Sequence, residues 1–538
     1  MLPDGFAQAP PAWFLSWESP PVRPRPSPTR TGQATTRSEP AQREGRGRCD
    51  HLDLTTGEPD TIFPPNAASY SGGQVAANLC DSLLTIDADY NVRPNLATSR
   101  QVDPLTLVYT LREGVKFWDG RPVTAEDVAY SLNRGRDPSS IVSFLYENVH
   151  SVAVTGTNEV TVKFSKPDEL FNSEMASFAG MVMEKDYTER AGQSAGTSTG
   201  GLMCSGPFKL DSWKPGDSIA IVRNDDYWDQ TRRPFAKRVR FTFVTDGSAL
   251  VQALNAGEID GAYEIPPTAI PALRGSARGR LAFGNSLNLL GLMVTNPDGP
   301  LGDVQLRRSL QNIVDRDALA KSVYHGAATP SFTFLTPPTW PEDQKAGYEK
   351  AYDSFARDRA YNIDKAKQLV GQSKYRGQKA IQAGDETTSR TAQLIQQLAK
   401  QVGVNIEITS MTPLVFEQAT SDPAKRQGID MMLRVGFDVA RDPIEPLLFV
   451  YMPGQVYNYL RYDNGEVTTL LTAARQTFDN ADRAQTIVAA QEIYEQGSTV
   501  IPLLANYTVT FLNNRLTGAI TSLAYWSMPQ MAYVGSAG

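Results

Sequence analysis

An alternation of strand-like and helix-like segments predicts an α/β fold for most of this chain. After residue 51, short runs rich in β-branched and aromatic residues alternate with segments whose apolar residues recur at helical spacing. The composition agrees, since 41% of the 538 residues are apolar and 21% are charged, as in soluble globular proteins. At this length we expect roughly three to five domains or one large lobed body.

Five runs are expected to form strands, because β-branched or aromatic residues dominate them and several alternate apolar with polar positions. They are residues 106–111, 160–164, 219–223, 238–243 and 406–409. Helical segments lie between them, which is the order typical of an α/β protein.

The segments between the strands carry helix signals. Thr124 and Asp127 form a capping box, with Asp in place of the commoner Glu, and they predict a helix that runs to residue 134. Apolar residues at helical spacing predict further helices over residues 303–315 and 389–402. A long helical stretch is expected over residues 463–494.

The first fifty residues differ from the rest in composition. They hold nine prolines and seven arginines but no lysine. A secretory signal needs a basic start, about 7–15 apolar residues and a small-residue cleavage site, a pattern that this stretch does not show. Its composition is typical of disorder, so we expect residues 1–50 to be a disordered tail or a mis-assigned start, with a functional basic arm as the alternative.

Charge and apolar runs argue against two classes of protein. The formal net charge of −7 does not suit a nucleic-acid binder. No apolar run approaches the ~18 residues of a membrane-spanning helix. The three cysteines and three histidines lack the spacing of a zinc site, so we expect no metal and no cofactor.

One short motif matches that of serine hydrolases. Residues 196–200 read GTSTG and fit G-x-S-x-G. A nucleophile elbow requires an apolar strand before the serine, whereas the residues that lead into this motif have a loop composition. A catalytic triad would need a histidine, and His325 is the only one downstream. We therefore expect a connector and no enzyme activity, with a cleft hydrolase as a remote alternative.

Residues 111–134 are the most specific segment. They read LREGVKFWDGRPVTAEDVAYSLNR, in which a turn after a strand, an aromatic pair, an Asp-Gly turn and the capped helix follow one another. This segment strongly resembles the signature of family 5 solute-binding proteins, the dipeptide- and oligopeptide-binding class of ABC importers. Four further segments resemble the same family in the same order: residues 78–87, 204–228, 290–316 and 388–408.

The resemblance implies a two-lobed periplasmic-binding-protein-like fold of type II, cluster C, with an extra subdomain in the N-terminal lobe and a two-segment hinge. The ligand would be enclosed between the lobes. The implied organisation is a tail over residues 1–50, lobe I over 51–92, the extra subdomain over 93–199, lobe I again over 200–284, lobe II over 285–502 and the C-terminal strands of lobe I over 503–538.

The resemblance also implies a function. We expect the substrate-binding component of an ABC importer, monomeric and extracytoplasmic, in the periplasm or on the outer face of the cell membrane. It would hand a di- or oligopeptide to a membrane permease and its ATPase. A sugar, a nickel chelate, a siderophore or a signalling peptide stay open as alternative ligands.

Two of the three cysteines are expected to pair. Cys80 and Cys204 both fall in the predicted first lobe, and an exported protein could join them in a disulfide. Two buried free thiols are the alternative. Cys49 is a candidate for lipidation, as in Gram-positive relatives, although residues 46–48 (RGR) depart from the small apolar lipobox.

The first ligand-binding candidates are Ser69, Tyr70, Ser71 and Gly72. They lie where relatives have a Gly/Ser/Thr-rich loop that touches the ligand. Exposed backbone N–H groups in such a loop could bind a carboxylate or a peptide carbonyl. An ordinary helix-capping loop is the alternative.

The second group of candidates is Phe437, Asp438, Arg441 and Asp442. Peptide-binding relatives carry here an aspartate that pairs with the ligand's α-amino group, and a carboxylate suits an ammonium in a dry cleft. This chain has Ala440 at that place, flanked by the two acids. We expect one of these acids to take the role, with Tyr70 and Phe437 packing on the ligand, while Arg441 could favour an anionic ligand.

Overall fold

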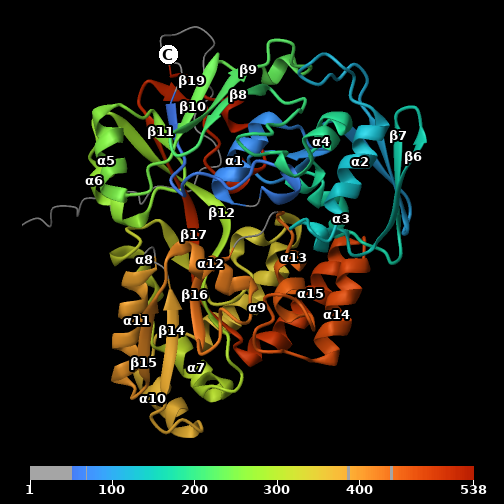
Figure 1. The fold of residues 1–538 in the computed structure, drawn as a ribbon. Coiled ribbons are helices and arrows are strands. Elements are labelled where there is room, and N and C mark those ends of the chain that lie inside the picture. The colour runs from blue at the N-terminus through green and yellow to red at the C-terminus, as the bar shows by residue number, and fades with distance from the viewer. Residues whose placement is uncertain (1–50, 68, 385–387, 437–439, 538) are drawn as a thin grey trace, which may run out of the picture. The chain divides into compact units, whose positions relative to one another are not determined.

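The computed structural model describes residues 51–67, 69–384, 388–436 and 440–537, and it has the mixed α/β fold expected from the sequence (Figure 1). The strands are β1 (His51–Asp53), β2 (Leu84–Ile86), β3 (Val92–Pro94), β4 (Ala97–Asp103), β5 (Thr106–Leu111), β6 (Val149–Gly156), β7 (Glu159–Phe164), β8 (Phe208–Lys214), β9 (Ser218–Arg223), β10 (Arg238–Thr242), β11 (Gly261–Ala262), β12 (Gly279–Val294), β13 (Ala328–Pro330), β14 (Lys379–Gly384), β15 (Asn405–Ser410), β16 (Met431–Gly436), β17 (Val500–Asn513), β18 (Leu516–Thr517) and β19 (Gly535–Ser536). The helices are α1 (Tyr70–Leu79), α2 (Ala125–Gly135), α3 (Leu170–Glu174), α4 (Lys185–Ala191), α5 (Gly247–Ala256), α6 (Ile270–Arg274), α7 (Val304–Asn312), α8 (Arg316–Ser322), α9 (Lys345–Asp358), α10 (Ile363–Gln372), α11 (Ser389–Gln401), α12 (Pro413–Ser421), α13 (Ile444–Tyr451), α14 (Gly465–Gln476) and α15 (Asn480–Tyr494).

One 11-stranded sheet runs through both lobes, in the order β15-β14-β16-β12-β17-β11-β1-β10-β9-β8, with β13 paired to β17. We call lobe I the part that holds β1–β11 and α1–α6, and lobe II the part that holds β13–β16 and α7–α15. The long antiparallel strands β12 and β17 belong to both (Figure 1). Their pairing is interrupted between Asn285 and Leu289, so the two crossing strands lose their regular ladder where the lobes meet.

A separate antiparallel sheet, β4-β5-β7-β6, lies within the segment expected to form the extra subdomain. Helix α2 packs against it and begins as predicted. The Thr124 side chain accepts from Asp127 N at 3.3 Å, and Asp127 Oδ2 accepts from Thr124 N at 3.0 Å. Two orphan donors of the first turn are thus satisfied reciprocally, which confirms the capping box.

The helical stretch expected over residues 463–494 is two helices, so the prediction of one continuous stretch is wrong. Helix α14 ends at Gln476 and α15 begins at Asn480. The break has a local cause, because the Asp479 side chain accepts from Ala481 N and Asp482 N and starts a new helix.

The end of the chain completes the core of lobe I. The Trp526 indole donates to Ser69 O at 3.0 Å and forms an edge contact with Phe178, with 5.0 Å between ring centroids. A Cβ added at Gly73 would lie 1.9 Å from Trp526 Nε1, so only glycine lets helix α1 approach the indole this closely. Helix α1 and the C-terminal segment therefore form one packing unit.

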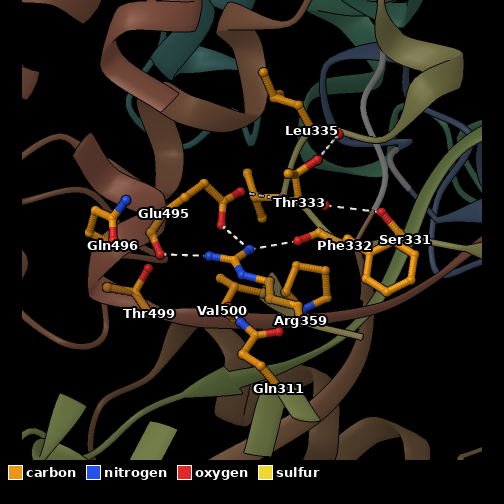
Figure 2. A network of polar contacts seen from close by, with 12 residues as sticks. Gln311, Ser331, Phe332, Thr333, Leu335, Arg359, Glu495, Gln496, Thr499 and Val500 are labelled. Carbon is orange, nitrogen blue, oxygen red and sulfur yellow. Dashed lines mark hydrogen bonds and ion pairs between the residues drawn. The ribbon is translucent and has the colours of Figure 1, made fainter. Parts of the chain in front are cut away.

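A buried ion pair connects separate segments of lobe II (Figure 2). Arg359 Nη1 lies 2.7 Å from Glu495 Oε2, and both side chains are almost fully buried. Arg359 also donates to Phe332 O at 2.6 Å, and Glu495 Oε1 accepts from Phe334 N at 2.6 Å. The network joins the loop before α9 to the end of α15, and its charges are satisfied by short contacts.

Cys80 and Cys204 are bonded in the structure, with 5.0 Å between their Cα atoms and a separation of 124 residues. In the part of the chain that the structure describes, no helix is both long and apolar enough to cross a membrane.

Candidate ligand-binding site

The floor of the candidate site is the interrupted stretch of β12 and β17. Ser286 Oγ donates to Asn506 O, and Asn288 N donates to Ser286 Oγ at 3.1 Å. The buried amide oxygens Asn288 Oδ1 and Asn506 Oδ1 have no hydrogen-bond partner among the described residues. Buried acceptors of this kind are costly unless a donor reaches them. The hinge therefore holds two amide oxygens that could each accept a hydrogen bond from a ligand.

Lobe I supplies a wall of tyrosines around one acid. Asn288 Nδ2 donates to Tyr70 OH at 3.3 Å, and Tyr90 OH donates to Asn285 O at 2.6 Å. Tyr525 OH donates to Glu264 Oε1 at 3.1 Å. Burial raises the pKa of Glu264 to about 7.

The same burial, with a smaller contribution from Glu264, raises the pKa values of Tyr70 and Tyr90 well above the usual range. Both phenols therefore stay neutral near pH 7 and act as hydrogen-bonding groups without charge. Together the tyrosines and Glu264 make a wall that is largely apolar but ends in polar atoms.

Lobe II faces this wall with two arginines. Arg434, on β16, lies over the Tyr457 ring at 4.6 Å and donates to Tyr459 OH at 3.5 Å. Among the described residues, no carboxylate lies within ion-pair distance of its guanidinium, although Glu417 acts on it from further away. Arg441 donates to Trp340 O at 2.8 Å.

The two arginines of lobe II act on tyrosines of lobe I. Arg434 partly offsets the effect of burial and of Glu264 on the pKa of Tyr70, and Arg441 does the same for Tyr90. A solute held between the walls would therefore meet an acid on one side and guanidinium groups on the other.

A second set of contacts joins the lobes away from the hinge. Arg475 Nη2 lies 2.7 Å from Asp168 Oδ2, and Glu169 N donates to Arg475 O at 2.9 Å. Arg483 Nη1 lies 3.0 Å from Glu169 Oε2, and burial raises the pKa of Glu169 to about 7 despite this arginine. The ring of Phe144 meets that of Phe449 at 4.5 Å.

Asp442 belongs to this second set of contacts. Its carboxylate lies 2.8 Å from Arg483 Nη2, accepts from Ile444 N at 2.9 Å and is almost fully buried. A carboxylate already neutralised and bonded in this way is a poor receptor for a ligand ammonium. Phe437 and Asp438, the neighbouring candidates, lie outside the described residues.

The expected ligand loop at residues 69–72 is the start of helix α1. Ser69 Oγ accepts from Gly72 N at 3.0 Å as the helix N-cap, and Ser71 Oγ bonds Thr56 Oγ1 at 2.6 Å. These groups satisfy one another, so the helix-capping alternative describes Ser69, Ser71 and Gly72. Tyr70 alone of the four reaches the hinge.

Arg434 and Glu264, two residues that act on the pKa of Tyr70, were not predicted from the sequence. Arg434 is a lone charge in an otherwise apolar strand, MMLRVG, and that pattern could have marked it. Glu264 follows the short strand β11 and had no comparable signal. The G-x-S-x-G segment forms turns, with no strand leading into it. The described residues hold no cluster of three or more His, Cys, Asp or Glu that could bind a metal.

Comparisons with known proteins give the fold and family. The chain is 25% identical over 520 residues to the oligopeptide-binding protein OppA of Bacillus subtilis, which covers 88% of this chain and 92% of that protein. It is 25% identical over 486 residues to the glutathione-binding protein GsiB of Escherichia coli K12, with 88% and 91% covered.

Solved structures are similar over nearly their full length. The oligopeptide-binding protein AppA of Bacillus subtilis, in complex with a nonapeptide, superposes with a TM-score of 0.78 at 18% identity, covering 92% of this chain and 100% of that one. AgaA of A. tumefaciens R10, in complex with agropinic acid, gives a TM-score of 0.77 at 19% identity, with 91% and 99% covered. These similarities confirm the two-lobed type II fold.

The family model described as bacterial extracellular solute-binding proteins, family 5, middle region, matches residues 91–458. Members of this family are the extracytoplasmic substrate-binding proteins of ABC transporters and are not enzymes. With the two lobes, the crossing strands and this match, the chain belongs to the family 5 extracellular solute-binding proteins.

Proposed function

We propose that this protein binds a peptide between its lobes, outside the cytoplasm, and delivers it to a membrane permease driven by an ATPase. The observation that supports an anionic ligand concerns Arg434. Its guanidinium is fixed by two tyrosines, faces lobe I and has no carboxylate at ion-pair distance among the described residues.

A guanidinium held in a closed cleft needs an anion, because desolvating a cation without a partner is costly. A ligand carboxylate matches its planar array of donors better than any neutral group. The hinge adds the acceptors Asn288 Oδ1 and Asn506 Oδ1, which suit the N–H groups of a peptide backbone. A solute with a carboxylate and amide donors satisfies all three groups.

The relatives support the same class. The two relatives compared by sequence are named for oligopeptides and for glutathione. A binding function is enough to explain the site, because enclosing and releasing a ligand breaks no covalent bond. Closure of the lobes on the ligand would present it to the permease.

The test is to identify what the protein carries. Protein purified without refolding is denatured, and the released small molecules are identified by mass spectrometry. We expect peptides, each with a free carboxylate. A ligand with no anionic group would overturn the proposal.

Arg434→Met gives the matching binding test with the identified ligand. We expect affinity to fall at least tenfold, because losing one partner of a buried charge pair costs about 2–5 kcal/mol. Arg426→Met is the control, since Arg426 also lies over the Tyr459 ring, at 4.2 Å, but donates to backbone carbonyls of its own lobe. Equal effects of the two variants would contradict the assignment.

A further inference from the structure

Glu264 has an unusual backbone. Its φ of 53° lies in the left-handed region, which residues other than glycine seldom adopt. Contacts on both sides hold it there: Thr55 Oγ1 donates to Tyr263 O at 2.9 Å, and Ile265 N donates to Val509 O at 2.9 Å. Strained backbone of this kind persists where the surroundings over-determine it and is concentrated at binding sites.

The carboxylate that this backbone presents has phenols around it and, among the residues that the structure describes, no cation beside it. Tyr525 OH donates to it, the electrostatic effect of its charge reaches Tyr70 and Tyr90, and Thr508 of β17 lies beside it. No Lys, Arg or His of the described ranges forms an ion pair with Glu264. The residue as a whole is half-buried, and burial is the main cause of the raised pKa of its carboxyl.

Other acids near the lobe interface are already paired. Asp442 and Glu169 pair with Arg483, and Asp168 pairs with Arg475. Glu264 is the acid of the ligand site that keeps an unmatched negative charge within the described residues. It lies in lobe I, whereas the guanidinium of Arg434, which forms no ion pair among the described residues, lies in lobe II.

We propose that Glu264 binds the positively charged amino group of the ligand, so that a zwitterionic peptide lies with its ammonium on lobe I and its carboxylate on Arg434 of lobe II. This inference rests on the proposed function. Tyr525 orients the carboxylate by its hydrogen bond, and the neighbouring phenols supply π-faces that suit an ammonium.

Proton linkage follows from the surroundings of Glu264. Of the groups that face it, Tyr70, Tyr90 and Tyr525 have pKa values raised well above their usual range by burial, so none of them titrates near pH 7. Arg434 stays charged, since its pKa is raised despite its burial. Burial places the pKa of Glu264 itself at about 7, so it must lose a proton to pair with an ammonium. Affinity for an amine should therefore rise from pH 5 to pH 7, by up to about tenfold per pH unit.

The experiment offers the protein an equimolar mixture of synthetic tri- to pentapeptides, half with a free amino terminus and half N-acetylated. Retained peptides are counted by mass spectrometry for wild type, Glu264→Gln and Glu258→Gln. Glu258 is an exposed acid in the same lobe and serves as the matched control. An unchanged ligand-free melting temperature shows that each variant is folded.

We expect wild type and Glu258→Gln to prefer the free-amino peptides at least tenfold, and Glu264→Gln to lose this preference. The affinity for the retained free-amino peptide should rise with pH in wild type and stay flat in Glu264→Gln. Equal retention of both peptide forms by wild type, or a preference that Glu264→Gln keeps, would overturn the inference alone. Retention of neither form would overturn the proposed function and this inference with it.

Discussion

Arg475 of lobe II and Asp168 of lobe I form an ion pair across the two lobes, with Asp168 Oδ2 accepting from Arg475 Nη2 at 2.7 Å and from Nε at 3.1 Å. The Asp168 side chain is 1% exposed, and Asn148 Nδ2 also donates to it, at 2.9 Å. The lobes are therefore joined in this structure by polar contacts away from the hinge.

Arg475→Gln should speed ligand release. The substitution leaves Asp168 buried without a cation, at a cost of about 3–5 kcal/mol to the closed arrangement, whereas lobes that have moved apart can hydrate the carboxylate. We expect a dissociation rate raised at least tenfold and a ligand-free melting temperature that changes little. Stopped-flow displacement of the bound ligand measures the rate.

Arg461→Gln is the control for this variant. Arg461 pairs with Asp298 within lobe II at 2.6 Å, and both side chains are exposed, so we expect almost no effect. A dissociation rate of Arg475→Gln that matches this control would show that the cross-lobe pair does not hold the closed form.

Oxidised protein should contain one reactive thiol when it is titrated under denaturing, non-reducing conditions. The chain has three cysteines, and the structure bonds Cys80 to Cys204, which leaves Cys49. Replacing both bonded cysteines by alanine should lower the free energy of unfolding by about 4–5 kcal/mol, because the bond closes a long loop. Three reactive thiols in the wild-type protein would refute the pairing.

Glu495→Gln should destabilise lobe II. The substitution leaves the buried guanidinium of Arg359 without its counter-charge, which costs about 3–5 kcal/mol (Figure 2). Urea denaturation followed by tryptophan fluorescence measures the loss. Glu407→Gln is the control, because its partner Lys379 and Glu407 are both half-exposed, and it should change the free energy by less than about 1 kcal/mol. A shift no larger than this control would contradict the role of the pair.

Glu264 should also make the ligand-free protein less stable at higher pH. Its pKa is about 7 when folded, above the ~4.3 of an unfolded chain, so the folded state binds the proton more tightly. The stability from this group is fully present below about pH 4.3 and is lost as pH rises through 7. Between pH 5 and pH 8 the melting temperature of wild type should therefore fall more than that of Glu264→Gln. Parallel melting-temperature curves for the two proteins would show that the pKa of the Glu264 carboxyl is not raised.

The sequence predicted the features whose causes are local. The box of Thr124 and Asp127 lies within four residues and could be identified from those residues alone. The break at Asp479 was equally local, and the helical spacing on both sides of it obscured the N-cap. The five expected strands are all present, because their composition is set by their own burial.

The candidate site could not be predicted in the same way, because charges become paired or unpaired only in the fold. The sequence makes Asp442 a candidate for a ligand ammonium, but its partner Arg483 lies 41 residues further along. Glu264 and Arg434 lie on different lobes, and both act on the pKa of Tyr70 only because β12 and β17 bring the lobes together. No spacing rule relates such residues.

The packing of Trp526 on helix α1 fixes the order in which the protein can mature. The lobe I core includes residues from 52 to 287 and again from 512 to 534, whereas the central core of lobe II lies between 290 and 504. During translation, every residue of that lobe II core leaves the ribosome before the segment that fills lobe I. The part of the chain made first is the last to be completed, and a truncated chain would expose the face of helix α1 at Gly73 that the indole covers.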